Sequence, residues 1–341
     1  MVFIKRLGTT LAHSTIGNIK STPVNLSVRL LSTSSTTLSD YVKIVEVGPR
    51  DGLQNEKTIV STHIKVALIN QLVAAGLPTV EATSFVSPKW VPQMADASEV
   101  YKLITSVPTK SNVSFPVLVP NMKGLESALD VGVKEIAIFG AASESFSQKN
   151  INCSVEESIQ RFKQVVEAAL KKGVKVRGYV STIVGCPYEM DIHPDAVAKL
   201  SQRMYEMGCY EISLGDTIGV ATPNKIRTVI EAVSRVVPIE KLAMHCHDTY
   251  GQAIANILTS IEMGIRVIDS SVAGLGGCPY AKGATGNVST EDVVYLLHGL
   301  GMHTGVDMQA LATTGHFISK QLNRPNGSKA GLAMVNKLGL N

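Results

Sequence analysis

Two histidines separated by one residue, His245 and His247, are the residues of this chain most suited to chemistry. They follow the apolar run Leu242 to Met244, which is typical of a buried strand. Side chains alternate between the two faces of a strand, so both imidazoles should point to one side and Cys246 to the other. Imidazole is the commonest metal ligand, and the pattern therefore predicts a chelating pair. The alternative is two polar residues at the rim of a strand.

The elements that would position this pair recur along the chain as apolar strands alternating with helical stretches. Glycines such as Gly76 and Gly173 stand just past predicted helix ends, where a left-handed residue ends a helix at low cost. The predicted strands are 43–47, 80–82, 115–119, 136–139, 176–179, 210–212, 242–245 and 267–268. This alternation predicts a (β/α)8 TIM barrel with additional C-terminal helices from about Met308. A doubly wound open sheet is the alternative, because alternation alone does not prove closure.

In such a barrel, residues directly after the strands gather at one mouth. Those positions are polar here: Arg50, Asp51 and Gln54 follow the first strand, Glu81 lies on the second, Asp216 follows the sixth, and the histidines lie on the seventh. The eighth strand runs into a glycine-rich segment that ends at Cys278. We therefore expect one mouth of the barrel to gather carboxylates, an arginine, two imidazoles and a thiol.

The net charge of +4 comes entirely from residues 1–39. Their basic residues are Lys5, Arg6, Lys20 and Arg29, and subtracting these four from the 32 basic residues leaves 28, against 28 acidic residues. A neutral body does not indicate a nucleic-acid or anionic-membrane partner. No apolar run reaches the 18 or so residues of a membrane span, so we expect a soluble protein.

Segment 1–39 is also rich in serine and threonine, which predicts a mitochondrial transit peptide cleaved a few residues after Arg29. The expected location is the mitochondrial matrix. We then expect a catalytic TIM barrel at 40–305 and a C-terminal helical extension, packed on the barrel, at 306–341. The five cysteines are scattered and contain no C-x-x-C pair, which suits a reducing compartment without a disulfide framework.

Five motifs resemble those of the 3-hydroxy-3-methylglutaryl-coenzyme A (HMG-CoA) lyase family, within the wider group of metal-dependent barrel lyases. They are VEVGPRDGLQ at 45–54, EATSFVSPKW at 81–90, GCPY at 185–188, HCHD at 245–248 and SVAGLGGCPY at 271–280. The last is similar to the signature around the family's catalytic cysteine. The resemblance, which runs from about Val42 to Asn323, implies a homodimer that cleaves HMG-CoA to acetoacetate and acetyl-CoA, in leucine degradation and ketogenesis.

By this resemblance the metal ligands are Asp51, His245, His247 and Asn287. Two imidazoles, one carboxylate and one amide oxygen form a mainly hard site, which suits Mg²⁺ or Mn²⁺. Two histidines and a carboxylate suit non-haem iron equally well, so that alternative stays open.

Two further residues are expected to act on the thioester. Arg50 stays protonated and so cannot be a base, but it can hold the thioester oxygen where negative charge develops. Cys278 has a thiol that is mostly protonated at neutral pH, which suits a general acid toward the enolate carbon. The alternative for Cys278 is a small packing residue.

The remaining residues are assigned supporting or binding roles. Glu81 is expected to hold Arg50, and Asp216 to orient a histidine or to transfer a proton. The expected catalytic set is therefore Arg50, Asp51, Glu81, Asp216, His245 and Cys278. Glu291 could brace the loop around Asn287 or be a solvated residue at a helix start. Substrate contacts are expected at Arg50 and Gln54 and, by resemblance, at Lys57 and Asn323, with Arg324 a looser candidate.

Other functions share the barrel and the ion. Synthases that condense acetyl-CoA with a 2-oxo acid and aldolases that release pyruvate are the nearest alternatives, and the Cys278 segment favours the lyase. A catalytically silent metal-binding partner protein should lack some of Arg50, Asp51, Glu81 and Cys278, but all four are present.

Overall fold

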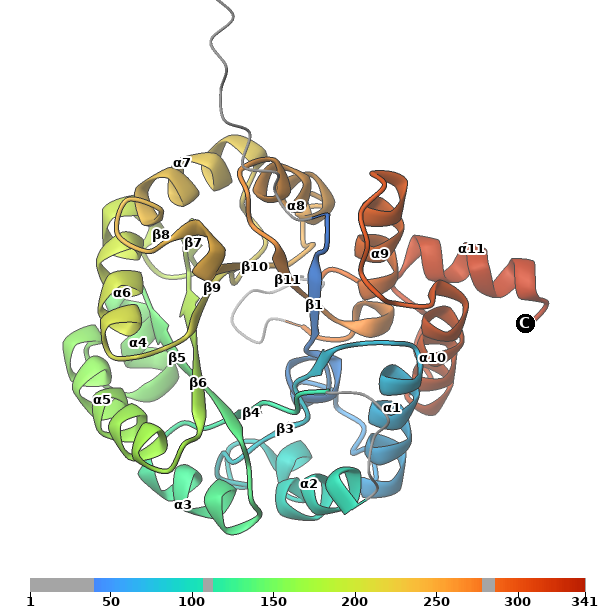
Figure 1. Cartoon of the computed structure of the whole chain (residues 1–341), viewed down its shortest axis with the longest axis horizontal. Helices are drawn as coiled ribbons and strands as arrows, with labels where there is room; N and C mark the ends of the chain where they lie inside the picture. The colour runs from blue at the N-terminus through green and yellow to red at the C-terminus, as the bar shows by residue number, and fades with distance from the viewer. Residues whose placement is uncertain (1–39, 107–112, 278–285, 341) are drawn as a thin grey trace, which may run out of the picture. The chain divides into compact units, whose positions relative to one another are not determined.

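Parallel strands alternate with helices through most of the chain, and the helices surround the strands (Figure 1). The computed structural model describes residues 40–106, 113–277 and 286–340. The strands of the main sheet are β1 (Lys43–Glu46), β2 (Thr79–Val80), β3 (Thr83–Ser84), β4 (Val117–Leu118), β5 (Glu135–Ala141), β6 (Lys175–Ser181), β9 (Glu211–Asp216), β10 (Leu242–Cys246) and β11 (Val267–Ser270).

The sheet closes on itself. Its strand order is β2-β1-β11-β10-β9-β6-β5-β4-β3, and the first and last strands are two parts of one segment, 79–84. Between these parts, the Glu81 amide donates to the Glu46 carbonyl at 2.8 Å and the Ala82 amide to the Pro116 carbonyl at 2.9 Å. Segment 79–84 therefore bonds to strands on both sides, and the prediction of a TIM barrel is confirmed over an open sheet.

The outer layer consists of helices that bury apolar faces against the barrel. They are α1 (Thr62–Ala74), α2 (Ala97–Ser106), α3 (Met122–Asp130), α4 (Glu144–Ile151), α5 (Val155–Lys171), α6 (Pro194–Glu206), α7 (Pro223–Val233), α8 (Ala253–Glu262) and α9 (Thr290–Gly299). Local chemistry sets their ends: Ser154 and Glu157 form a capping box at the start of α5. Gly76 and Gly173, at φ +94° and +71°, stand just past α1 and α5, as predicted for helix-ending glycines.

The chain continues after the barrel into α10 (Met308–Gln321) and α11 (Lys329–Leu338). Figure 1 shows α10 beside α1 and α9, so it joins the outer layer where the last and first helices meet. A Cβ added to Gly76 would lie 2.2 Å from the Gly305 carbonyl oxygen, which shows how closely the two backbones approach. No helix in the described part of the chain is long and apolar enough to cross a membrane.

One structural feature was not predicted: a short antiparallel hairpin, β7 (Gly185–Cys186) and β8 (Met190–Asp191), in the loop after β6. The predicted second strand, 80–82, also differs: Val80 is the last residue of β2, and residues 81 and 82 connect β2 to β3. Both differences depend on contacts with distant segments, which local apolar patterns do not contain.

A buried ionic group spans the interior of the barrel. Arg177 of β6 is 1% exposed and donates to Glu211 at 2.7 Å and to both carboxylate oxygens of Asp269 at 2.7 and 3.1 Å. Its guanidinium also lies 4.9 Å from the ring centre of Tyr179. These contacts compensate for the loss of hydration that the three charged groups suffer on burial.

Replacing Arg177 with Met should lower the free energy of unfolding by about 3–5 kcal/mol, because two buried carboxylates would lose the guanidinium that pairs with both of them. Urea denaturation followed by circular dichroism measures the change. Arg203→Met is the control: its ion pair with Glu156 lies at the surface, so the urea midpoint should hardly move. Equal midpoint shifts in the two variants would contradict the prediction.

Candidate active site

The two histidines lie at the end of β10 and face the barrel mouth. Their ring centres are 5.3 Å apart, and both residues are buried, at 8% and 7% exposure. Cys246, between them, is part of the hydrophobic core. The alternation expected from a strand is therefore present around His245 and His247.

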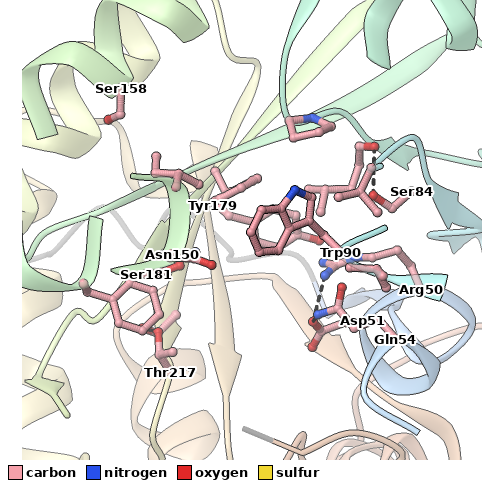
Figure 2. Close-up of a pocket in the computed structure, with 18 of the residues that line it drawn as sticks. Arg50, Asp51, Gln54, Ser84, Trp90, Asn150, Ser158, Tyr179, Ser181 and Thr217 are labelled. Atoms are coloured by element: carbon pink, nitrogen blue, oxygen red, sulfur yellow. Dashed lines mark hydrogen bonds and ion pairs between the residues drawn. The ribbon is translucent and has the colours of Figure 1, made fainter. Parts of the chain in front are cut away.

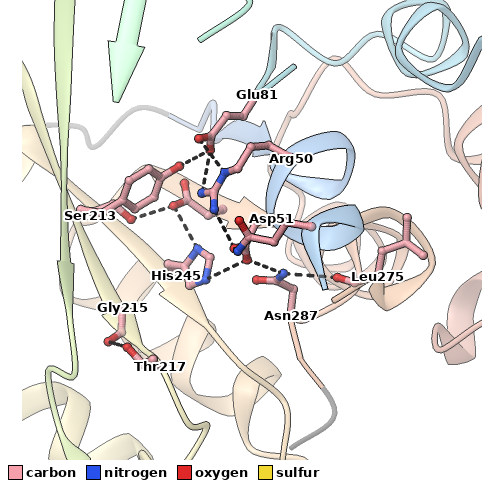
Figure 3. Close-up of polar contacts among 12 residues, drawn as sticks. Arg50, Asp51, Glu81, Ser213, Gly215, Thr217, His245, Leu275 and Asn287 are labelled. Carbon is pink, nitrogen blue, oxygen red and sulfur yellow. Dashed lines mark hydrogen bonds and ion pairs between the residues drawn. The ribbon is translucent and has the colours of Figure 1, made fainter. Parts of the chain in front are cut away.

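Asp51 reaches the same point from η1 (Gly48–Gly52), the helical turn that follows β1. One possible ligand atom from each of Asp51, His245 and His247 lies within 4.8 Å of the others. Asn287 joins them from the other end of the chain, since its Nδ2 donates to Asp51 at 2.8 Å and to the Leu275 carbonyl at 3.2 Å. Figure 3 shows Asp51, His245 and Asn287 together. With His247, which groups with Asp51 and His245, the structure thus brings the expected metal-ligand set to one place.

The chemistry of this set fits a divalent cation. The Nδ1 atom of His245 is 3.3 Å from Asp269 and its Nε2 atom is 4.0 Å from Asp51, so Nε2 faces the cluster. The Nδ1 atom of His247 is buried and lacks a hydrogen-bond partner within the described residues. Burial and the nearby His245 lower the pKa of His247 to about 4, which keeps this imidazole neutral at pH 7.

The carboxylate of Asp51 supplies the negative charge. Burial raises its pKa, but Arg50 and the two histidines oppose this effect, and the net pKa lies below the ordinary value. Two imidazoles and one carboxylate match the preferences of a hard or borderline divalent ion.

Arg50, also from η1, is fixed by two carboxylates. Its Nε and Nη2 atoms donate to the two oxygens of Glu81 at 2.9 and 3.2 Å, and its Nη1 donates to Asp51 at 2.7 Å. The expected contact between Glu81 and Arg50 is therefore present. Three of the five guanidinium N–H groups have partners in these bonds, which leaves donors for an oxygen in the cavity.

Tyr179 and Asp269 support these groups and were not predicted from the sequence. The Tyr179 hydroxyl donates to Glu81 at 2.5 Å, and its ring packs edge-on against His245. Asp269 lies opposite His245 in the register of β10 and β11 and contacts its Nδ1. A signal was available for Tyr179, because polar residues occur at every second position of β6, which places them on one face of the strand. The four residues of β11, Val-Ile-Asp-Ser, do not alternate in this way, so this strand carries no such signal for Asp269.

Asp216 has different contacts from those expected. It lies opposite Cys246 in the register of β9 and β10, so its side chain shares the face of Cys246 and not that of His245. Its carboxylate accepts from the amides of Val220 and Ala221 at 3.1 and 3.0 Å, and burial raises its pKa to about 6. The contact to a histidine that we expected from Asp216 comes from Asp269.

Two buried glutamates hold the segment that leads toward Cys278. Glu291 accepts from the Ala273 amide at 2.9 Å and is fully buried, so it braces this segment and is not a solvated residue at a helix start. Glu46, which was not predicted, accepts from the amides of Gly48 and Val272 at 2.8 and 2.9 Å. Glu46 thereby connects the turn that carries Arg50 and Asp51 to the segment that follows β11.

The other predicted residues lie at the edge of this arrangement or beyond it. Gln54 donates to Asp51 at 2.8 Å, whereas Lys57 and Asn323 are exposed. Arg324 forms an ion pair with Glu56, which brings the loop that carries Lys57 close to the end of α10. Cys278 lies outside the described residues, and its assignment as general acid stays a prediction.

A cavity of about 660 Å³ opens above the cluster. Arg50, Asp51, Gln54 and both histidines line it, together with residues of α4 and α5. Figure 2 shows Arg50, Gln54 and Trp90 on one wall and Asn150, Ser181 and Thr217 across from them. The cavity thus joins the charged cluster to a larger binding space.

Asp51→Asn should weaken Mn²⁺ binding by at least tenfold, because it removes the negative charge of the cluster. Electron paramagnetic resonance of free and bound Mn²⁺ measures this directly. Asp216→Asn is the matched control, since its carboxylate bonds to backbone amides, and it should bind Mn²⁺ like the unmodified protein. Equal Mn²⁺ affinities in the two variants would show that Asp51 is not a metal ligand.

Comparison with known proteins agrees with this geometry. Residues 41–318 match the family model described as HMGL-like. The mitochondrial hydroxymethylglutaryl-CoA lyase of Bos taurus is 60% identical over 308 residues, which are 90% of this chain and 94% of that protein.

Solved structures give the same result. The hydroxymethylglutaryl-CoA lyase of Pseudomonas aeruginosa superposes with a TM-score of 0.85 at 56% identity, over 88% of this chain and 99% of that one. An HMG-CoA lyase of A. baumannii, in complex with coenzyme A and 3-methylmalate, has a TM-score of 0.82 at 34% identity, over 89% and 97% of the two chains. With its fold and the gathered motif residues, this chain belongs to the HMG-CoA lyase family.

Proposed function

We propose that this protein cleaves HMG-CoA to acetoacetate and acetyl-CoA. The observation that carries the proposal is the pairing of Arg50 with Asp51, which places a fixed guanidinium beside a metal-binding cluster in one cavity. A thioester that carries a 3-hydroxyl and a carboxylate needs both a group for the thioester oxygen and a group for the hydroxyl.

The metal site consists of Asp51, His245, His247 and Asn287. A bound Mg²⁺ or Mn²⁺ lowers the pKa of the substrate hydroxyl and orients the bond to be cleaved. The Asn287 nitrogen faces two acceptors, the Asp51 carboxylate and the Leu275 carbonyl, so its oxygen is the atom left to act as ligand. Oxygen and imidazole ligands without thiolate favour these ions.

Arg50 holds the thioester oxygen while the bond between carbons two and three breaks. The substrate hydroxyl gives up its proton to a base, the electrons of the broken bond pass to the thioester, which becomes an enolate, and the hydroxyl-bearing carbon becomes the ketone of acetoacetate. Glu81 and Tyr179 keep Arg50 in place, so its remaining N–H groups meet the developing charge without rearrangement. Protonation of carbon two, which we assign to Cys278, then gives acetyl-CoA.

Incubation of the purified protein with HMG-CoA and Mg²⁺ should yield equal amounts of acetoacetate and acetyl-CoA, and EDTA should abolish the reaction. Coupled assays of the two products measure the yield. In Arg50→Gln, kcat should fall by about 100-fold or more, because a donor to the developing oxyanion is lost. Mn²⁺ binding should persist in this variant. Condensation of acetyl-CoA with a 2-oxo acid, without HMG-CoA cleavage, would overturn the proposal.

We also infer that the protein is imported into the mitochondrial matrix, with residues 1–39 as its transit peptide and a homodimer as the mature form. The basic, serine- and threonine-rich composition of this segment supports import, as does the description of the Bos taurus relative as mitochondrial. The catalytic barrel would then occupy 40–305, with the helical extension at 306–341.

N-terminal sequencing of protein isolated from mitochondria should find a start a few residues after Arg29. Deletion of residues 1–39 should leave HMG-CoA cleavage intact and prevent import, because the targeting signal would be lost and the catalytic barrel retained. Mature protein that begins at Met1 in the matrix would contradict the inference.

A further inference from the structure

The only tryptophan of the chain, Trp90, is 84% exposed and lines the cavity. Tryptophan carries the largest apolar side chain, and leaving it in water gives up the free energy that its burial would provide. Some other molecule covering the ring would recover that free energy. The position of Trp90 in the cavity wall makes a ligand of the cavity the first candidate.

The segment that carries Trp90 is held firmly in place. The amides of Trp90 and Val91 both donate to the Ser87 carbonyl, at 2.9 and 3.1 Å, and form a tight turn. Immediately after this turn, Gln93 is 2% exposed: its Oε1 accepts from the Val60 amide and its Nε2 donates to the Thr58 carbonyl, both at 2.9 Å. The turn is therefore tied to the loop that follows Gln54.

A buried lysine strengthens the same attachment. Lys65 of α1 is 3% exposed and donates to the Gln93 carbonyl and, at 2.6 Å, to Asp96. Asp96 also accepts from the Thr62 hydroxyl at 2.9 Å. A buried ammonium is costly unless it is paired, so this network is a substantial anchor beneath the turn. The exposed indole thus projects from a braced support.

The neighbours of Trp90 indicate what covers it. It shares a wall of the cavity with Arg50 and Gln54 (Figure 2). Under the proposed function, on which this inference rests, Arg50 holds the thioester oxygen. The group bonded to the thioester sulfur is the pantetheine arm of coenzyme A, a neutral chain of methylenes, amides and geminal methyl groups. Such a chain packs well on a flat indole, whereas the charged nucleotide lies at its far end.

We propose that Trp90 is a substrate-binding residue whose indole ring packs against the pantetheine arm of the acyl-CoA substrate. The contact holds the arm in the cavity beside Arg50 and so strengthens substrate binding. It explains why a large aromatic side chain is kept exposed on a rigid turn at the wall of the cavity.

Fluorescence tests the proposal directly, because Trp90 is the only tryptophan and excitation at a wavelength selective for tryptophan reports on it alone. Free pantetheine and coenzyme A should each change the emission in a saturable way. Adenosine 3′,5′-bisphosphate, which is the nucleotide end without the arm, should not. A response to the nucleotide but not to pantetheine would overturn the proposal, as would emission that depends on protein concentration alone and so reports a contact between copies.

Calorimetry with coenzyme A distinguishes a failure of the role of Trp90 from a failure of the proposed function. Binding of coenzyme A without any change in emission would overturn the role of Trp90 and leave the proposed function intact. If coenzyme A does not bind, the proposal of an acyl-CoA substrate fails, and the inference about Trp90 fails with it.

Kinetics of Trp90 variants provide a second readout. Trp90→Ala should raise KM about tenfold for HMG-CoA and equally for HMG-pantetheine, with kcat nearly unchanged, since an apolar contact to a non-reacting part of the substrate is lost. Trp90→Phe should restore KM to within about twofold. Tyr295→Ala is the matched control: Tyr295 is also exposed, at 67%, but lies on α9 outside the cavity lining, so KM should not change. An effect limited to HMG-CoA would instead assign Trp90 to the nucleotide.

Discussion

The contact on which the rest of the site depends is the ion pair between Arg50 and Asp51. These neighbours in the sequence carry opposite charges into a buried position, where neither would be stable alone. Glu81 gives Arg50 a second carboxylate, and Asn287 and Gln54 donate to Asp51. The result is a fixed cation beside a fixed anion. One can hold a thioester oxygen and the other a metal ion, and neither must reorganise when substrate arrives.

This pair is supported by a second layer of charge inside the barrel. Arg177 neutralises Asp269, and Asp269 in turn contacts Nδ1 of His245, so the Nε2 atom of that ring faces Asp51. The alternating side chains of β6 and β11 form this layer, in a part of the barrel that apolar residues commonly fill. Stability and ligand orientation therefore depend on the same buried network.

Two glutamates and a tryptophan extend the site beyond the metal cluster. Glu46 and Glu291 are buried and bond to backbone amides of segment 272–273, which leads toward the glycine-rich motif. Burial raises the pKa of Glu46 to about 7 and that of Glu291 to about 8. Trp90 lines the cavity from a turn braced by Lys65 and Gln93. The glutamates thus fix backbone behind the site, and an exposed aromatic ring is available to a ligand in the cavity.

The sequence by itself determined the features that depend on local patterns. Alternation along one strand predicted that His245 and His247 share a face, and repeated strand–helix units predicted the barrel positions, because side-chain period and helix ends are properties of short segments. Only the tertiary structure decided which distant residues meet. Segment 79–84 closes the barrel through hydrogen bonds on both sides, and the register of β9, β10 and β11 gives His245 the partner Asp269 and places Asp216 beside Cys246. A shift of one residue between strands exchanges the two faces, and no local pattern records that register.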